Sequence, residues 1–282
     1  MTARGRFLSV LVTIVVALAG FVTLGALPAG ASPPIIQYVA LGDSYAAGTA
    51  VGSFPNCQLG DDGYPEQLLD LGSRIDLQAN VACSGATTFA VIDNQLWALD
   101  SGTRLVTITV GAANLDLSGL LAVCTQTPAN CQAAIIERLA LLPALGSDLT
   151  DLYAEVAEVA PRARVVVTGY PPLFEPVNPL FIAINDAIDQ LNSTIEQAVS
   201  VANDADVNIH YVDVTEEFAG RGLVIDRGVI KCPNPDAFIH GLFIDCDPRK
   251  PDPERFHPTA EGYRAYADAI SAALPGGWLN KS

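Results

Sequence analysis

The sequence predicts an α/β fold with a doubly wound parallel sheet, and two observations support this prediction. Short runs rich in valine and isoleucine recur along the chain, and segments with helical periodicity lie between them. Near-continuous hydrophobicity in a short run is typical of a parallel strand that is buried on both faces. Strands that alternate with helices indicate a parallel sheet that is covered by helices on both sides.

Four short runs are expected to form the strands of this sheet. They cover residues 35–41, 105–110, 164–168 and 209–212. Between them, residues 132–160 and 180–203 carry apolar residues at helical spacing and are expected to form helices. A terminal helix is expected over residues 259–274, with Thr259 as its N-cap and Glu261 in its first turn.

The segment over residues 218–255 has a different character. It is rich in glycine, proline and aspartate, holds two cysteines and shows little periodicity. These features predict a long loop that is pinned by a disulfide. Because the loop leads directly to His257, it is a candidate wall for a substrate site.

The first 31 residues have the three-part layout of a secretory signal peptide. Arg4 and Arg6 precede an apolar run from residue 7 to about residue 27, and Ala29-Gly30-Ala31 forms a small-x-small cleavage site. We expect cleavage after Ala31, which leaves a secreted protein with one domain over residues 32–282. The apolar run approaches the ~20 residues that a membrane helix needs, so an uncleaved anchor that ties the protein to the cell envelope is the alternative.

The charge balance argues against two classes of partner. The full chain has a formal net charge of −16, and without its first 31 residues it holds 13 basic against 31 acidic residues, a net charge of −18. Nucleic acid is excluded, because its phosphates require lysine and arginine. Tight docking on anionic lipid headgroups is disfavoured for the same reason. We expect the charge to keep a secreted protein soluble.

All six cysteines follow the expected signal peptide. An even number of cysteines in an exported chain indicates disulfides, and six cysteines allow 15 complete pairings. Because the cysteines lie as sequence neighbours with short intervening loops, we expect the bonds Cys57–Cys83, Cys124–Cys131 and Cys232–Cys246. A zinc site is the competing interpretation, but the sequence has no C-x-x-C pair and no nearby histidine cluster. No metal or other cofactor is expected.

Two distant segments carry the residue types of nucleophilic catalysis. Residues 39–45 form an apolar run that stops at Gly42 and presents Ser44, and residues 252–258 offer His257 with an acid three residues before it. A serine attacks an ester only if a base takes its proton and a third group orients that base. Ser44 follows the first expected strand, at the sheet edge where such folds bind ligands. These segments predict an esterase-type hydrolase.

The motifs resemble those of the SGNH, or GDSL, hydrolase family over nearly all of the mature chain. Gly42-Asp43-Ser44-Tyr45 resembles the first block, Ala82-Cys83-Ser84-Gly85-Ala86-Thr87 the second, and Glu254-x-x-His257-Pro258 the last. The resemblance implies a three-layer α/β/α sandwich with a flavodoxin-like parallel sheet. The arrangement of neighbouring cysteines is similar to that of secreted actinobacterial lipases and phospholipases of this family.

The resemblance also implies roles for individual residues. Ser44 is the expected nucleophile, although a serine after a strand is more commonly a helix N-cap. His257 is the expected general base, and the backbone N–H groups of Ser44 and Gly85 are expected to bind the oxyanion. Glu254 stands where most family members have an aspartate that orients the histidine. Asp252 or a backbone carbonyl could take this role instead.

The third block departs from the family pattern. Family members read Gly-x-Asn-Asp after the strand, and the asparagine side chain donates to the oxyanion. Here the residues are Gly111-Ala112-Ala113-Asn114-Leu115-Asp116, so an ungapped alignment puts Ala113 in the asparagine position. Either the turn is rearranged so that Asn114 points into the site, or one donor is missing, which costs ~10²–10³ in rate.

Substrate choice is only weakly indicated. Apolar residues between Pro171 and Phe181 could line an acyl pocket or could pack a strand against the next helix. We expect a lipid or simple carboxylic ester as substrate and a monomeric enzyme. An esterase of acetylated polysaccharides is one alternative, and a binding protein on this fold with a weakened catalytic site is another.

Overall fold

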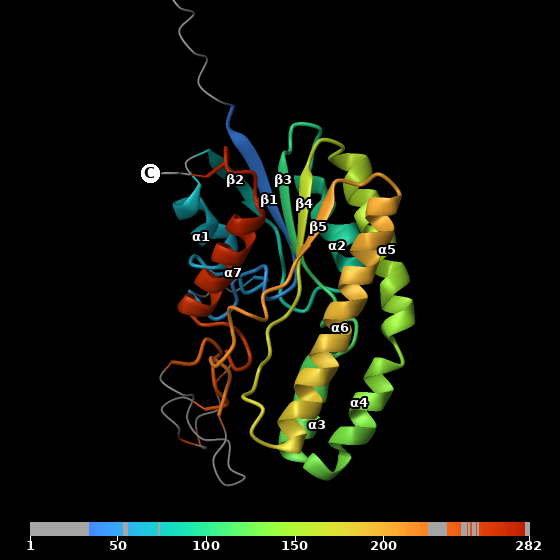
Figure 1. Ribbon diagram of the computed structural model, residues 1–282, viewed down its shortest axis with the longest axis vertical. Coiled ribbons are helices and arrows are strands. Elements are labelled where there is room, and N and C mark those ends of the chain that lie inside the picture. Colours follow the sequence, from blue (N-terminus) through green and yellow to red (C-terminus); the bar gives the residue numbers. More distant parts are fainter. Residues whose placement is uncertain are drawn as a thin grey trace, which may run out of the picture. The chain divides into compact units, whose positions relative to one another are not determined.

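A five-stranded parallel sheet forms the centre of the fold (Figure 1). In the computed structural model its strands are β1 (Ile36–Gly42), β2 (Ile75–Asn80), β3 (Leu105–Thr109), β4 (Arg164–Thr168) and β5 (Ile209–Val212). The strand order is β2-β1-β3-β4-β5, which is the order of flavodoxin-like doubly wound sheets. The predicted α/β/α class is therefore confirmed.

The structure describes residues 34–52, 56–72, 74–224, 236–243, 247, 249, 252 and 254–279. The expected signal peptide, its alternative as an anchor, and the expected bond Cys232–Cys246 lie outside these residues. None of the helices within the described ranges could serve as a membrane span.

Helices cover both faces of the sheet (Figure 1). On one face, α1 (Tyr64–Leu71) packs against α7 (Ala260–Ala273). The other face is covered by α2 (Thr88–Gln95), α5 (Leu142–Val159) and α6 (Pro179–Asp204). The same side carries α3 (Leu117–Gln126) and α4 (Cys131–Leu139), and α4 contacts both α3 and α6. Two short 3₁₀ turns, Leu96–Ala98 and Pro128–Asn130, complete the helical elements described.

The single helix expected over residues 132–160 is two helices. α4 ends at Leu139 and α5 begins at Leu142, with Pro143 in its first turn. A proline ring clashes with the carbonyl four residues before it, which here belongs to Leu139, the last residue of α4. The apolar periodicity is helical on both sides of the break, so the sequence pattern predicts one continuous helix.

The other long helices agree closely with the expected ranges. α6 extends over Pro179–Asp204, and α7 begins after Thr259, whose side chain accepts a hydrogen bond from the Gly262 N–H as an N-cap. Strand β2 was not predicted, because Asp76, Gln78 and Asn80 give it the half-polar character of an edge strand. The short helices α1, α2 and α3 were not predicted either.

The carboxyl ends of β1 and β3 lie side by side. Gly42, the last residue of β1, pairs with Thr109, the last residue of β3. From β1 the chain order runs to β2 on one side and to β3 on the other, so this is the point where the strand order reverses. Sheets of this kind bind ligands in the crevice outside such a point.

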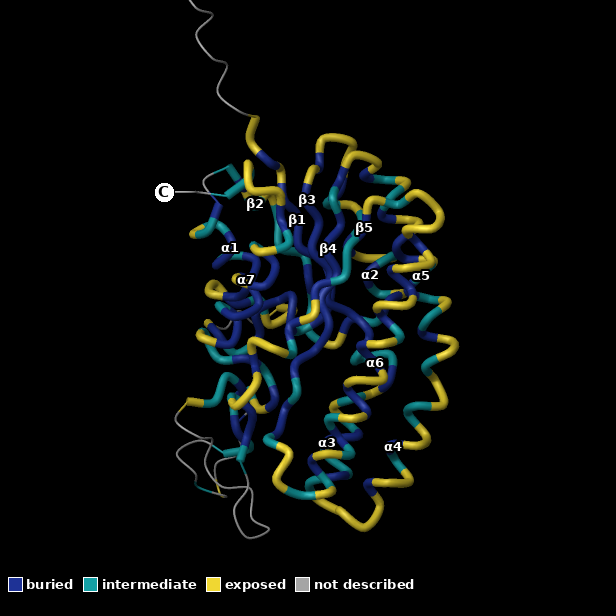
Figure 2. The backbone as a smooth tube through the Cα atoms, in the orientation of Figure 1, coloured by how far each residue is buried: buried dark blue, intermediate teal, exposed yellow. Residues whose placement is uncertain are grey.

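The strands form the best-buried part of the fold (Figure 2). Leu41, Leu105 and Ile108 are fully buried, as expected for parallel strands covered on both faces. Hydroxyls buried within the sheet are paired, for example Tyr38 with Thr107 at 2.7 Å and Thr109 with Thr168 at 2.5 Å. A rigid, satisfied core of this kind fixes the positions of the loops at the carboxyl edge.

Candidate active site

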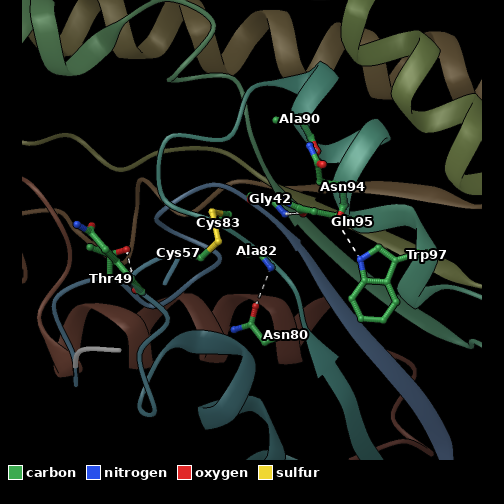
Figure 3. Close-up of a disulfide and its surroundings, with 11 residues drawn as sticks. Gly42, Thr49, Cys57, Asn80, Ala82, Cys83, Ala90, Asn94, Gln95 and Trp97 are labelled. Carbon is green, nitrogen blue, oxygen red and sulfur yellow. Dashed lines mark hydrogen bonds between the residues drawn. A yellow bond between two sulfur atoms is a disulfide. The ribbon is translucent and has the colours of Figure 1, made fainter. Parts of the chain in front are cut away.

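The turn that presents Ser44 depends on a glycine at the end of β1. Gly42 has a φ of +131°, and a Cβ at this position would lie 2.1 Å from the Thr109 carbonyl oxygen. The side-chain amide of Gln95 accepts from the Gly42 N–H at 2.7 Å and donates to the Gly42 carbonyl at 2.9 Å (Figure 3). The Asp43 N–H donates to the Thr109 carbonyl at 2.8 Å. These bonds set the exit of the chain from the sheet.

Ser44 and His257 are in direct contact. The His257 Nε2 lies 2.8 Å from the Ser44 Oγ, although 213 residues separate the two in sequence. Ser44 follows β1, and His257 lies three residues before α7. Residues 44–50 form turns and no helix, so Ser44 has no helix to cap. The two expected catalytic residues therefore have the geometry of a nucleophile and its base.

The environment of His257 keeps the imidazole neutral at physiological pH. Burial, the largest influence, together with the nearby His240 and Arg255, lowers the pKa of His257 from 6.5 to about 4, and the nearby backbone of Glu254 and Arg255 acts in the opposite direction. A neutral imidazole can accept the Ser44 proton at Nε2 when its own proton lies on Nδ1. Nδ1 is buried, and no described residue completes a hydrogen bond to it.

The two candidate acids lie beside a different histidine. The His240 Nδ1 is 3.8 Å from Asp252 Oδ2 and 3.9 Å from Glu254 Oε2. Asp252 also accepts the Glu254 N–H at 2.8 Å through Oδ1. Neither carboxylate is hydrogen-bonded to His257. The contact expected between Glu254 and His257 is therefore not formed, because the Glu254 side chain points toward His240.

Gly85 lies at the cavity that contains Ser44. Its φ is +80°, and nothing lies within 4 Å of where a Cβ would be. Within the described residues, neither the Ser44 N–H nor the Gly85 N–H is used in a hydrogen bond. Both groups are available to a ligand, as an oxyanion site requires.

A disulfide holds the segment before Gly85. Cys57 is bonded to Cys83 (Figure 3), and the Ser84 N–H donates to the Cys57 carbonyl at 2.9 Å. The Cys83 N–H donates to the Gly42 carbonyl at 3.0 Å, so this segment is also tied to the end of β1. The second expected bond that falls in the described residues, Cys124–Cys131, is also formed and links α3 to α4.

Asn114 does not line the cavity. Its amide is occupied by Thr88 at the start of α2: Oδ1 accepts the Thr88 N–H at 3.1 Å, and Nδ2 donates to the Thr88 Oγ1 at 2.9 Å. Ala112 and Ala113 face the cavity instead. The structure thus places Asn114 as an external cap of a helix N-terminus, and a methyl group stands where the family pattern has a side-chain donor.

The cavity around Ser44 has a volume of about 440 Å³. One wall is formed by α3, which contributes Leu117, Leu121 and Ala122 together with the polar Ser118, Thr125 and Gln126, and another carries Leu173, Leu242 and Phe243. Of the candidate acyl-pocket residues between Pro171 and Phe181, only Leu173 lines it. Phe174 and Phe181 stack at 4.6 Å in the core, which agrees with the packing interpretation.

Three buried residues of the site were not predicted from the sequence. Asp43, Tyr45 and Tyr170 are 2%, 6% and 1% exposed, respectively. Burial raises the pKa of Asp43 to about 7, although hydrogen bonds from Tyr170 and Tyr45 act in the opposite direction. Tyr170 lies directly beyond the strand predicted over residues 164–168, and side chains at strand ends form the sites of such sheets. This position could have identified Tyr170 as a site residue from the sequence.

Comparisons with known proteins agree with this geometry. Residues 40–265 match the model of the GDSL-like Lipase/Acylhydrolase family. A lipase from Streptomyces rimosus is 30% identical over 260 residues, which cover 87% of this chain and 90% of the relative. Lipase 1 of Streptomyces coelicolor is 33% identical over 180 residues, which cover 61% of this chain and 66% of the relative.

Solved structures show the same similarity. The extracellular lipase of Streptomyces rimosus superposes with a TM-score of 0.72 at 28% identity and covers 85% of this chain and 100% of its own. Phospholipase A1 of Streptomyces albidoflavus also has a TM-score of 0.72, at 30% identity and with the same coverage. The chain thus belongs to the GDSL-like lipase/acylhydrolase family and is a carboxylic ester hydrolase.

Proposed function

We propose that this protein is a secreted serine esterase that hydrolyses lipid or other acyl esters through an acyl-serine intermediate. The observation that carries the proposal is the 2.8 Å contact between Ser44 Oγ and His257 Nε2 at the wall of a cavity that several leucines line. Ser44 is the nucleophile and His257 is the general base.

Catalysis proceeds in two steps. Ser44 Oγ attacks the ester carbonyl while its proton passes to His257 Nε2, and the N–H groups of Ser44 and Gly85 hold the oxyanion. The alcohol leaves with the proton from His257, and the acyl group stays on Ser44. His257 then takes a proton from water, the resulting hydroxide attacks the acyl-enzyme, and Ser44 regains its proton as the acid leaves.

We propose that backbone carbonyl groups orient His257 in place of a carboxylate. Two observations support this assignment. The main chain is bonded on both sides of the histidine: the His257 N–H donates to the Glu254 carbonyl at 3.1 Å, and the His257 carbonyl accepts the His240 N–H at 2.8 Å. The Glu254 and Asp252 carboxylates are directed to His240.

The walls of the cavity support an acyl ester as substrate. Leu117 and Leu121 line the cavity from successive turns of α3, and Leu242 and Phe243 line it as well. Burial of an acyl chain on such surfaces contributes about 0.8 kcal/mol for each CH₂ removed from water. The names of two similar proteins, a lipase and a phospholipase A1, support the same class of substrate.

Secretion and a monomeric state are part of the proposal. Disulfides persist in oxidising compartments, and two are formed in the described residues. The similar Streptomyces rimosus lipase is extracellular. The signal-peptide pattern of residues 1–31 supports export, and size-exclusion chromatography of the exported protein tests the monomer.

Covalent labelling tests the nucleophile. A fluorophosphonate ester probe is expected to label the parent protein and to leave Ser44→Ala unlabelled, because the probe reacts with an activated serine. Absence of labelling in the folded parent protein would contradict a serine hydrolase. Equal labelling of Ser44→Ala would move the nucleophile to another residue.

A substrate panel tests the acyl group. Activity on 4-nitrophenyl butyrate, 4-nitrophenyl palmitate and a diacylphosphatidylcholine is compared with release of acetate from acetylated xylan. We expect the highest kcat/KM on an acyl ester longer than acetate. Preference for acetyl xylan would favour the polysaccharide esterase, and absence of turnover on all substrates would favour a binding protein.

A further inference from the structure

Asp43 is a buried carboxylate directly before Ser44, and both of its oxygens are used. Oδ1 accepts the Tyr45 N–H at 3.0 Å, and Oδ2 accepts the Tyr170 hydroxyl at 2.5 Å. Burial of a carboxylate costs free energy unless the carboxylate is hydrogen-bonded. The buried and fully hydrogen-bonded Asp43 therefore indicates a structural role in this part of the fold. The mechanism proposed above makes no chemical use of Asp43.

Tyr170 connects this carboxylate to the turn after β3. Its hydroxyl accepts the Ala112 N–H at 3.1 Å while it donates to Asp43. Its backbone is clamped by Asn192 of α6, whose amide pairs with the Tyr170 N–H and carbonyl, each at 2.8 Å. The hydroxyl therefore projects from a fixed point and joins two turns at the carboxyl edge of the sheet.

Tyr45 connects the same centre to the histidine. Its hydroxyl donates to the Phe256 carbonyl at 2.7 Å, one residue before His257. Phe256 has a φ of +67°, a left-handed conformation that a bulky residue adopts only when its surroundings impose it. The Tyr45 ring also contacts the rings of Tyr170 and His257, with centroid distances of 5.1 Å and 5.6 Å.

We propose that Asp43, Tyr45 and Tyr170 are positioning residues that hold Ser44, the 111–113 turn and His257 in a common register. The proposal rests on the assignment of Ser44 and His257 as nucleophile and base. The three residues act through their neighbours: Asp43 through the Ser44 turn, Tyr170 through the Ala112 backbone, and Tyr45 through the Phe256 carbonyl.

The geometry explains why this chain needs such a network. The nucleophile and base come from segments 213 residues apart, and Nδ1 of His257 has no side-chain anchor in the described residues. Ala113 supplies no side-chain donor, so catalysis depends on how the remaining backbone groups are placed. A displacement of about 1 Å in such a site costs about 10²-fold in rate.

The test removes single hydroxyl groups and leaves the rings in place. In Tyr45→Phe and Tyr170→Phe, kcat on a short acyl ester is expected to fall about 10- to 100-fold while KM stays within about threefold. The rate of fluorophosphonate labelling of Ser44 is expected to fall in parallel. The double variant is expected to lose less than the product of the two single losses, because the two hydroxyls act on one unit.

Two buried tyrosines provide matched controls. Among the described residues the Tyr153 hydroxyl has no hydrogen-bond partner, and the Tyr38 hydroxyl is paired with Thr107 inside the sheet. Tyr153→Phe and Tyr38→Phe are expected to keep the parent kcat, so they separate a positioning role from a general loss of stability. Near-UV circular dichroism checks that each variant is folded, and Asp43→Asn tests the centre of the network if a tyrosine variant does not fold.

The outcomes distinguish this inference from the proposed function. If Ser44→Ala is inactive but Tyr45→Phe and Tyr170→Phe keep kcat within threefold, only the positioning network is overturned. An equal loss of kcat in Tyr38→Phe would also overturn it, because the effect would then be one of stability. If Ser44→Ala keeps its activity, the proposed function itself fails.

Discussion

The nucleophile turn and the histidine loop are held in different ways. Around Ser44, the chain is fixed by the sheet and by a side chain, since Gly42 abuts Thr109 and is bonded at both backbone groups by Gln95. Around His257, main-chain bonds dominate: the His257 carbonyl accepts the His240 N–H at 2.8 Å, and the Phe256 N–H donates to the His240 carbonyl at 2.9 Å. The base is thus placed by its backbone.

This difference predicts which side chains can be substituted without loss of catalytic rate. On the nucleophile side, the backbone path itself requires glycine, so the sequence there is narrowly constrained. On the histidine side, the acidic side chains near His257 lie 3.8 and 3.9 Å from His240 and make no hydrogen bond to the His257 imidazole. The most informative experiments therefore compare the histidine with its neighbouring acid.

The largest expected effect separates His257 from Glu254. His257→Ala is expected to lower kcat by about 10⁴-fold or more, because no other base in the described part of the chain contacts the Ser44 hydroxyl. Glu254→Gln is expected to keep kcat within about threefold, because its carboxylate makes no bond to His257. Steady-state kinetics on one soluble ester measures both variants.

A carboxylate that orients the base would behave differently. Loss of such a residue in a serine triad costs about 10⁴-fold in kcat. A fall of that size in folded Glu254→Gln would restore the acid role that the sequence pattern suggested. His210→Gln is a suitable control, because His210 lies on β5 and bonds Asn208 at 3.1 Å.

The second prediction concerns the acidic limb of the pH profile. Burial lowers the pKa of His257 to about 4, so the imidazole stays neutral well below neutral pH. As the pH falls through about 4, His257 gains a proton and can no longer act as a base, and kcat/KM is expected to fall about tenfold per pH unit below that point. A limb centred near 6.5 in protein that is still folded would contradict the buried environment of His257.

The contrast between the two regions also explains what could be predicted from the sequence. The fold class was readable, because buried parallel strands are apolar throughout and long helices carry clear periodicity. Ser44 could be predicted for a related reason. The backbone conformation at Gly42 admits only glycine, so the glycine in the motif marks the turn that presents Ser44. The half-polar edge strand β2 gave no comparable signal, and the break before Pro143 was hidden by helical periodicity on both sides.

The orientation of side chains was beyond the sequence pattern. Glu254 lies at the spacing of an orienting acid, but its carboxylate lies 3.9 Å from His240, which is 14 residues away in sequence. Asn114 follows a strand as an oxyanion donor would, but Thr88 of α2 takes both ends of its amide. Tertiary contacts between segments that are remote in sequence decide both cases.

The third prediction concerns the disulfide on the nucleophile side. Removal of Cys57–Cys83 by the double substitution Cys57→Ser/Cys83→Ser opens a loop of 26 residues and is expected to lower the free energy of unfolding by about 3.5 kcal/mol. We also expect kcat to fall about tenfold, because the Gly85 segment loses its anchor. Urea unfolding and steady-state kinetics measure the two effects.

The bond Cys124–Cys131 provides the comparison for this prediction. Its loop spans seven residues, so Cys124→Ser/Cys131→Ser is expected to cost about 2 kcal/mol with a smaller change in kcat. If the Cys57/Cys83 variant folds and turns over at the parent rate, the disulfide has only a stabilising role.

The smallest expected effect on rate tests Asn114 at the turn after β3. Its Oδ1 accepts the N–H of Thr88, which is one of the first-turn donors of α2 that have no acceptor within the helix. Asn114→Ala is therefore expected to lower the free energy of unfolding by about 1–2 kcal/mol and to keep kcat within about threefold. An oxyanion donor would show the reverse pattern, a loss of about 10²–10³ in kcat with little change in stability.

Thr88→Val removes the hydroxyl partner alone and is expected to give a smaller loss of stability with the parent kcat. Since Asn114 and Thr88 share these bonds, a double-mutant cycle should show coupling in stability and none in kcat.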